Sequence, residues 1–166
     1  MTPLKILTAL FVLTIAPQKA VTAAPETIPP EAKKAFERAM SLREENKYKQ
    51  ALKVYDEIIS KDKDNARAYQ ERGAVLAALG RYDDAIKQEK NALKLDPKLH
   101  LAHIYIGMIY GNKKRFLDAY SQLKQASEIK PDSYVIHMRL GVVCKRLKRL
   151  DEAKSEYEAA ARLMRE

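Results

Sequence analysis

Apolar and small side chains along this chain recur at the spacing of amphipathic helices, and the whole pattern returns every 34 residues. Within residues 66–99, Tyr69, Gly73 and Leu76 follow one another at intervals of three to four positions, which is typical of one helical face. Gly80 ends this stretch, as glycine does where a helix must turn left-handed. A second stretch with the same spacing follows and stops before an Asp-Pro pair. Each period therefore predicts two helices joined by a short turn.

Four consecutive units share this pattern, and we place them at residues 32–65, 66–99, 100–133 and 134–166. Three repeat positions hold related residues in every unit: Ala39, Gly73, Gly107 and Gly141; Ala51, Ala85, Ala119 and Ala153; and Tyr48, Tyr82, Phe116 and Leu150. A fixed period of this length indicates a solenoid of stacked units. Because a helical glycine costs up to about 1 kcal/mol relative to Ala, three glycines at one position predict close contact between the two helices of a unit.

The order of residues in each unit resembles the tetratricopeptide repeat: a large residue, a small one four places on, Ala, an aromatic, Ala and a closing Pro. The resemblance covers residue 32 to the end, and Pro97 and Pro131 close two of the units. It implies an all-α, right-handed superhelical solenoid of antiparallel helix pairs that binds other proteins. The chain departs from the pattern in having no Trp and in placing Glu89 where the family has an aromatic residue.

Residues 1–24 do not follow the repeat and have the pattern of a secretory signal peptide. A short apolar run with one charge, Lys5, precedes Val21-Thr22-Ala23, a motif typical of a cleavage site. We expect cleavage after Ala23 or Ala24 and location in the periplasm or outside the cell. An uncleaved membrane anchor is the alternative. Cleavage lowers the net charge from +9 to +7 by removing two Lys, and residues 25–31 form a Pro-rich linker.

The resemblance places the ligand-binding, concave surface on the first helix of each unit. The residues expected to line a peptide-binding groove are Lys33, Phe36, Met40, Arg67, Gln70, Leu101, Ile104, Met108, Asn112, Val135, Met138, Val142, Lys145 and Arg146. In units 3 and 4 most are apolar, which is typical of an interaction surface, and we expect Ile104 and Met138 to lie outside the core. Alternatively, these side chains fold onto neighbouring helices or unit 4 stacks on a second copy.

The expected partner is a protein or peptide segment, amphipathic and acidic at one end, because Lys145 and Arg146 lie at the groove's rim. The five positions that form a carboxylate clamp in one subtype of the resembled family carry none of its residues here, so that subtype is excluded. A homodimer formed through an uncapped C-terminal helix is the alternative function. Nucleic acid is not an expected partner, since the basic runs have no interleaved aromatic residues.

Other chemistry finds little support in the sequence. His103 and His137 share one repeat position, but no carboxylate or thiolate completes a metal-ligand set near them. Cys144 is the sole cysteine, which excludes an internal disulfide, and its helix face predicts a small buried group. No arrangement typical of catalysis is present, so we expect neither an enzyme nor a cofactor. A row of basic residues along the turns within the units serves solubility or, alternatively, peripheral contact with a membrane or envelope polymer.

Overall fold

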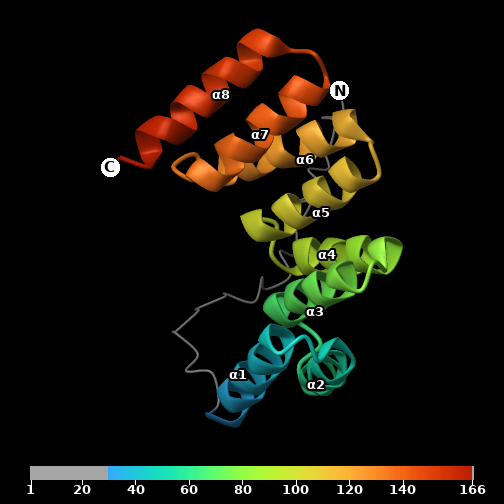
Figure 1. The fold of residues 1–166 in the computed structure, drawn as a ribbon. Coiled ribbons are helices and arrows are strands. Elements are labelled where there is room, and N and C mark those ends of the chain that lie inside the picture. The colour runs from blue at the N-terminus through green and yellow to red at the C-terminus, as the bar shows by residue number, and fades with distance from the viewer. Residues whose placement is uncertain (1–29, 166) are drawn as a thin grey trace, which may run out of the picture.

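The computed structural model describes residues 30–165, which form eight helices and no strands. The helices are α1 (Pro30–Glu44), α2 (Tyr48–Lys61), α3 (Ala66–Ala78), α4 (Tyr82–Leu95), α5 (His100–Asn112), α6 (Phe116–Ile129), α7 (Tyr134–Arg146) and α8 (Leu150–Leu163). Consecutive helices pair as antiparallel hairpins, and the four hairpins stack into a curved array from α1–α2 to α7–α8 (Figure 1). This arrangement confirms the all-α solenoid. The predicted signal peptide and most of the linker lie outside the described residues.

Each hairpin turn is closed by the same backbone hydrogen bond, although its side chains differ from unit to unit. In each hairpin, the residue directly before the second helix donates its N–H to the carbonyl oxygen five residues earlier. The pairs are Lys47 to Leu42, Arg81 to Leu76, Arg115 to Tyr110 and Arg149 to Cys144, at 2.8–2.9 Å. This is the bond of a Schellman motif, which needs a left-handed residue just before the donor. Those residues are Asn46, Gly80, Lys114 and Lys148, with φ between 57° and 74°.

The two helices of units 2 to 4 touch at the shared glycine, as the sequence predicts. A Cβ atom added to Gly107 would lie 3.0 Å from Leu123 Cγ, and one added to Gly141 would lie 2.5 Å from Tyr157 Cε1. At Gly73 the corresponding neighbour is Glu89 Oε1, also at 2.5 Å. Backbone and side chain thus meet with no room for a methyl group, which explains why the position is glycine.

The side chain that faces the glycine of unit 2 is a buried carboxyl group. Glu89 is 0% exposed, whereas the same repeat position carries Tyr55, Leu123 and Tyr157 in the other units. Within residues 30–165, neither carboxyl oxygen of Glu89 has a hydrogen-bond partner. Burial, and then the nearby charge of Glu71, raise the pKa of Glu89 to about 9. The folded chain therefore holds this group protonated at neutral pH.

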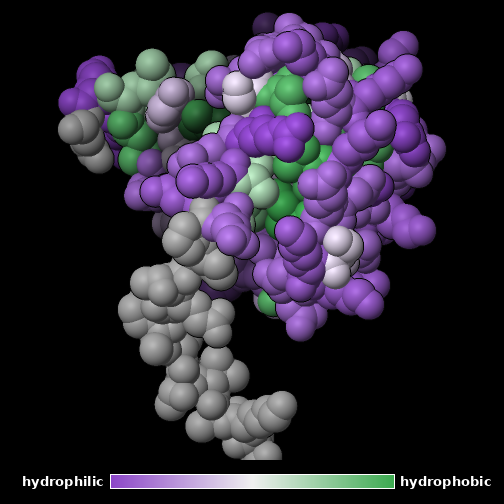
Figure 2. Space-filling model, turned by 90° about the horizontal axis from the view of Figure 1, so that it is seen from below, coloured by the Kyte–Doolittle hydropathy of each residue, from purple (hydrophilic) through white to green (hydrophobic). Residues whose placement is uncertain are grey.

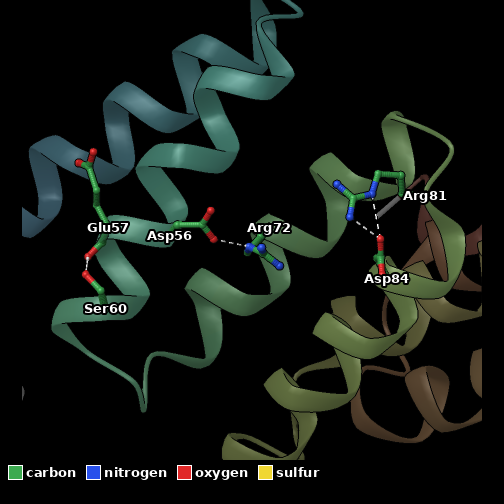
Figure 3. A network of polar contacts seen from close by, with 6 residues as sticks. All are labelled: Asp56, Glu57, Ser60, Arg72, Arg81 and Asp84. Carbon is green, nitrogen blue, oxygen red and sulfur yellow. Dashed lines mark hydrogen bonds and ion pairs between the residues drawn. The ribbon is translucent and has the colours of Figure 1, made fainter.

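Neighbouring units are joined by apolar packing and by surface ion pairs. Figure 3 shows one of these, in which Arg72 Nε of α3 donates to Asp56 Oδ1 of α2 at 2.7 Å. A second pair, Arg81 with Asp84, braces the turn between α3 and α4. Both carboxylates are at least half exposed, so each pair contributes little, typically below about 1 kcal/mol. The packed cores between units supply most of the cohesion.

The face seen from the α1–α2 end is mostly hydrophilic, with hydrophobic side chains visible in a strip between the hydrophilic ones (Figure 2). Among residues 30–165, no helix has the length and apolar content needed to cross a bilayer. Cys144 is fully buried with Leu140 and Val143 as neighbours along its helix, which confirms the prediction of a small core group. Burial also raises the pKa of its thiol.

Candidate binding hollow between α5 and α7

A hollow of about 570 Å³ opens between the first helices of units 3 and 4. Helix α6 contributes Phe116 and Leu123 to its lining, and α5 contributes Gly107, Met108, Gly111 and Asn112. The largest share comes from α7, with Tyr134, Val135, Met138, Arg139, Val142, Val143 and Arg146. Gly111 on α5 leaves open space there, because a Cβ added to it would meet no atom within 4 Å. The hollow is therefore largely apolar, and its walls belong to two successive units.

Six of the residues predicted to form the groove lie in this hollow: Met108, Asn112, Val135, Met138, Val142 and Arg146. Met138 and Val142 are 42% and 49% exposed, which is high for apolar side chains that sit side by side on one helix. The structure thus brings together the C-terminal half of the predicted set.

Three predicted groove residues are buried instead, and the expectation that Ile104 lies outside the core is wrong. Phe36, Gln70 and Ile104 are 8%, 3% and 7% exposed. They share one position in units 1 to 3, where the next unit packs over the first helix; Ile104 belongs to the same core cluster as Ile136 of α7. Met138 holds this position in unit 4, where no further described helix covers it.

The remaining predicted residues lie elsewhere on the surface. Lys145 does not line the hollow but lies beside Leu150 and Lys154 of α8, so the structure does not bring it together with the other predicted groove residues. Leu101 is 41% exposed on α5, outside the hollow's lining. Lys33, Met40 and Arg67 belong to units 1 and 2, more than one helix away in the stack; Lys33 and Arg67 are exposed and Met40 is half-buried.

Polar contacts, not an open apolar surface, occupy the first helices of units 1 and 2. Arg43 of α1 donates to Glu71 of α3 at 2.6 Å, and both side chains are largely buried. The Arg67 guanidinium lies 5.4 Å from the centre of the Phe36 ring, which helps to explain why Phe36 is covered. The two halves of the predicted groove therefore differ in chemistry as well as in depth.

Two arginines bring positive charge to the hollow, and one of them was missed by sequence reasoning. Arg139 and Arg146 both line it, and no carboxylate does. Neither arginine takes part in an ion pair within residues 30–165. The Arg139 Nε–H is buried and has no acceptor. Its repeat position, one residue beyond Met138, gave no signal in the sequence, because Glu71 and Tyr105 hold that position in units 2 and 3.

Tyr105 connects the polar and apolar halves. It lies near Glu71, Arg43, Glu89 and Arg139, and its pKa is raised, chiefly by burial and then by the Glu71 charge. The repeat position that runs from Glu71 through Tyr105 to Arg139 thus changes from acidic to basic along the solenoid.

The two histidines at the shared position make polar contacts with the second helix of their own units, and His137 also reaches the end of unit 3. His103 Nδ1 lies 3.0 Å from Gln122 Oε1. His137 Nδ1 lies 2.7 Å from Glu156 Oε2, and its Nε2 lies 2.8 Å from the Pro131 carbonyl oxygen. Within residues 30–165, no group of three His, Cys, Asp or Glu side chains is arranged to hold a metal ion.

Acidic neighbours compensate much of the basic row along the hairpin turns. The pairs are Lys47 with Glu45, Arg81 with Asp84, Lys113 with Asp83, Arg115 with Asp118 and Arg149 with Glu152. Arg115 and Arg149 also stack over Tyr110 and Tyr120. The row therefore presents less net positive charge than its sequence indicates, which weakens the hypothesis of membrane or polymer contact.

Comparison with known proteins relates this architecture to a protein family. Two models described as tetratricopeptide repeat match the chain, one over residues 36–100 and the other over residues 134–165. The chain belongs to the tetratricopeptide repeat family. The tetratricopeptide repeat fold is of the protein-interaction scaffold type, which agrees with the general function expected from the sequence. No curated protein sequence matches the chain.

Solved structures with the same fold include several of a tetratricopeptide repeat protein named MamA. A structure titled MamA 41-end from Desulfovibrio magneticus RS-1 is 19% identical, with a TM-score of 0.71, and the match covers 81% of this chain and 76% of that one. A structure titled Crystal structure of MamA is 17% identical, with a TM-score of 0.73, and the match covers 82% and 80% of the two chains. At these identities the likeness concerns the fold alone.

Proposed function

We propose that this protein is an exported, non-catalytic adaptor that holds an apolar segment of another protein in the hollow between α5 and α7. The observation that carries the proposal is the exposure of Met138 and Val142 inside a hollow of about 570 Å³. A contiguous exposed apolar surface usually marks an interaction site, and Met side chains adapt to varied partners. The fold agrees with this function, because stacked repeats present extended binding surfaces.

The binding part of the proposal is tested by blocking the hollow. Peptides selected from a random library on the immobilised full chain are measured against the wild type and the Val142→Asp variant. Burying an unpaired carboxylate where the ligand's apolar side chains dock should cost about 2 kcal/mol, or about thirtyfold in affinity. The matched control is Leu117→Asp on α6, because Leu117 is 64% exposed and outside the hollow.

Two measurements complete this test. Circular dichroism should show the same helix content in both variants, since Val142 and Leu117 are exposed. Equal affinity of the selected peptides for wild type and Val142→Asp would contradict the assignment of the hollow as the binding site. A substitution of Ile104 would not serve this test, because Ile104 belongs to the core.

Export is supported only by the sequence of residues 1–24. Mass spectrometry of protein recovered from outside the cytoplasm should give a chain shortened by about 23 residues at its N-terminus. Recovery of the full-length chain alone, held in the membrane, would replace cleavage by the anchor hypothesis. This measurement is independent of the binding test.

Self-assembly through the C-terminal unit is the less favoured function. At the repeat position where Leu52, Ile86 and Tyr120 pack toward the next unit, α8 carries the exposed Lys154. A charged side chain there disfavours stacking of another apolar helix on this face. Light scattering of the full chain should accordingly give the mass of a monomer, and a dimer would favour the alternative.

A further inference from the structure

We infer that Arg139 and Arg146 form an acid-recognition pair in the hollow, so that its occupant is an amphipathic helix carrying two acidic side chains two turns apart. This inference rests on the proposed function, because it specifies the chemistry of the segment that the hollow binds.

The Arg139 Nε–H is buried, and within residues 30–165 it has no acceptor. An unpaired buried donor is costly, and more so when it belongs to a charged group. Arg139 lines the hollow, so a ligand entering there can supply the missing acceptor once the guanidinium turns toward it. A carboxylate is the best complement, because it accepts two parallel hydrogen bonds from a guanidinium.

The charge of the lining favours the same ligand. Of the thirteen side chains and glycines around the hollow, two are arginines and none is acidic. Acidic neighbours compensate the basic residues of the hairpin turns, whereas Arg139 and Arg146 have no ion-pair partner within the part of the chain that the structure describes. The hollow is therefore a place of uncompensated positive charge surrounded by apolar walls, where a carboxylate is attracted more strongly than at the open surface.

The spacing of the two arginines defines the shape of the occupant. They are seven residues apart on α7, which corresponds to two helical turns, or about 10.5 Å. A partner helix lying along α7 presents acidic side chains at positions i and i+7 to both arginines. Its residues i+3 and i+4 then face Met138 and Val142 in the hollow. A helix also satisfies its own backbone groups, so it brings no unpaired amides to apolar walls.

The test uses two synthetic helical peptides that differ only in charge. Both carry Leu at i+3 and i+4; one has Glu at i and i+7 and the other has Gln there. We expect the full chain to bind the Glu peptide at least about tenfold more tightly than the Gln peptide, in line with charged hydrogen bonds of about 1.4 kcal/mol or more. The preference should decrease as salt is added.

Protein variants then locate the preference. Arg139→Gln and Arg146→Gln should each lower affinity for the Glu peptide by about tenfold and leave affinity for the Gln peptide within about twofold. Lys145→Gln is the matched control, because Lys145 is exposed on the same helix but outside the hollow. The wild-type comparison of the two peptides does not depend on the folding of any variant.

The outcomes separate this inference from the proposed function. If both peptides bind equally and Val142→Asp abolishes both, the hollow binds apolar helices and acid recognition is overturned. If the Glu peptide is preferred but Lys145→Gln removes the preference and Arg139→Gln does not, the assignment to the hollow is overturned. If Val142→Asp binds the Glu peptide as well as the wild type does, the proposed function fails too.

Discussion

Units 2 and 3 have the same backbone plan but bury different chemistry at the same point. Where α5 crosses α6, Gly107 faces Leu123, which is 1% exposed; where α3 crosses α4, Gly73 faces Glu89, which is 0% exposed. Leucine gains free energy from burial, whereas a carboxyl group without partners loses it. The close crossing of the two helices thus depends on the glycine of the first helix. It tolerates an unfavourable buried residue, such as Glu89, on the second helix. Unit 2 should be the less stable of the two.

The largest effect is expected when the side chain of unit 2 is placed in unit 3. Leu123→Glu removes a fully buried apolar side chain and adds a carboxyl to an apolar cluster, so the free energy of unfolding should decrease by about 4 kcal/mol or more. Chemical denaturation followed by circular dichroism measures it. Leu117→Glu on the same helix is the control, because Leu117 is 64% exposed and its substitution should change stability by less than about 0.5 kcal/mol. Similar values for the two variants would contradict the packing described here.

Forcing the helices of unit 3 apart should have the next largest effect. In Gly107→Leu the first added carbon already lies 3.0 Å from Leu123 Cγ, and overpacking of this kind costs about 3 kcal/mol. Hydrogen exchange should show faster opening in units 2 and 4 as well, because repeats share interfaces. Gly111→Leu on the same helix is the control, since nothing lies within 4 Å of a Cβ added there. An unchanged melting temperature for Gly107→Leu would place the helix crossing elsewhere.

Replacing the carboxyl of unit 2 should stabilise the protein. Glu89→Leu gives unit 2 the side chain of unit 3, and at pH 7 it removes the cost of protonating a group whose pKa is about 9 when folded and 4.5 ordinarily. That cost is about 3 kcal/mol. Thermal and chemical unfolding measure the gain. A less stable variant would show that Glu89 has a favourable partner in the folded chain.

Glu89→Leu should also change how the free energy of unfolding depends on pH. The pKa of Glu89 is higher in the folded than in the unfolded chain. Its contribution to the free energy of unfolding is therefore fully present below pH 4.5, decreases as pH rises and is lost by about pH 9. The difference in unfolding free energy between Glu89→Leu and wild type should therefore grow with pH across this range. Glu57→Gln, which changes an exposed carboxylate of α2, should leave the slope of the wild type in place.

The smallest effect concerns the turns of the two units. Gly80 and Lys114 hold the same left-handed position, with φ of 74° and 58°, and only glycine adopts that conformation without strain. Lys114→Gly should raise the unfolding free energy by about 0.5–1 kcal/mol, and Gly80→Lys should lower it by a similar amount. Lys113, directly before Lys114 at the end of α5, has a negative φ, so Lys113→Gly should be destabilising instead.

Most of the fold could be predicted because it depends on periodic features. The 34-residue spacing of Gly73, Gly107 and Gly141 placed the helix crossings correctly, and Asn65 accepts from the Ala68 N–H at the start of α3 as its position at the boundary indicates. These features are local or repeat in every unit, so one sequence contains several copies of the evidence. The same reasoning could foresee that Glu89 departs from the pattern, but not that both its oxygens lack partners.

The candidate site was harder to predict because it depends on how one unit covers the next. Ile104 and Met138 share a repeat position, yet one is 7% and the other 42% exposed. The next unit covers Ile104, which packs in one cluster with Ile136 of α7, whereas no described helix follows α8 to cover Met138 in the same way. A rule for a repeat position cannot express that difference. Arg139 was missed for a related reason: its importance comes from what surrounds its guanidinium, not from its place in the repeat.

The turn that joins the two helices of each unit is held by main-chain atoms, and the left-handed residue within it is Asn, Gly or Lys without change of geometry. The backbone geometry of the turn therefore does not depend on the side chains along that edge. Substitutions there can change the charge and solubility of the edge and lower the free energy of unfolding by only about 1 kcal/mol per turn. The packing of the helices behind the edge stays unchanged. In units 1 and 2 the edge is a natural attachment line for dyes, tethers or grafted epitopes, whereas the turn of unit 3 is flanked by Asn112 and Phe116, which line the hollow.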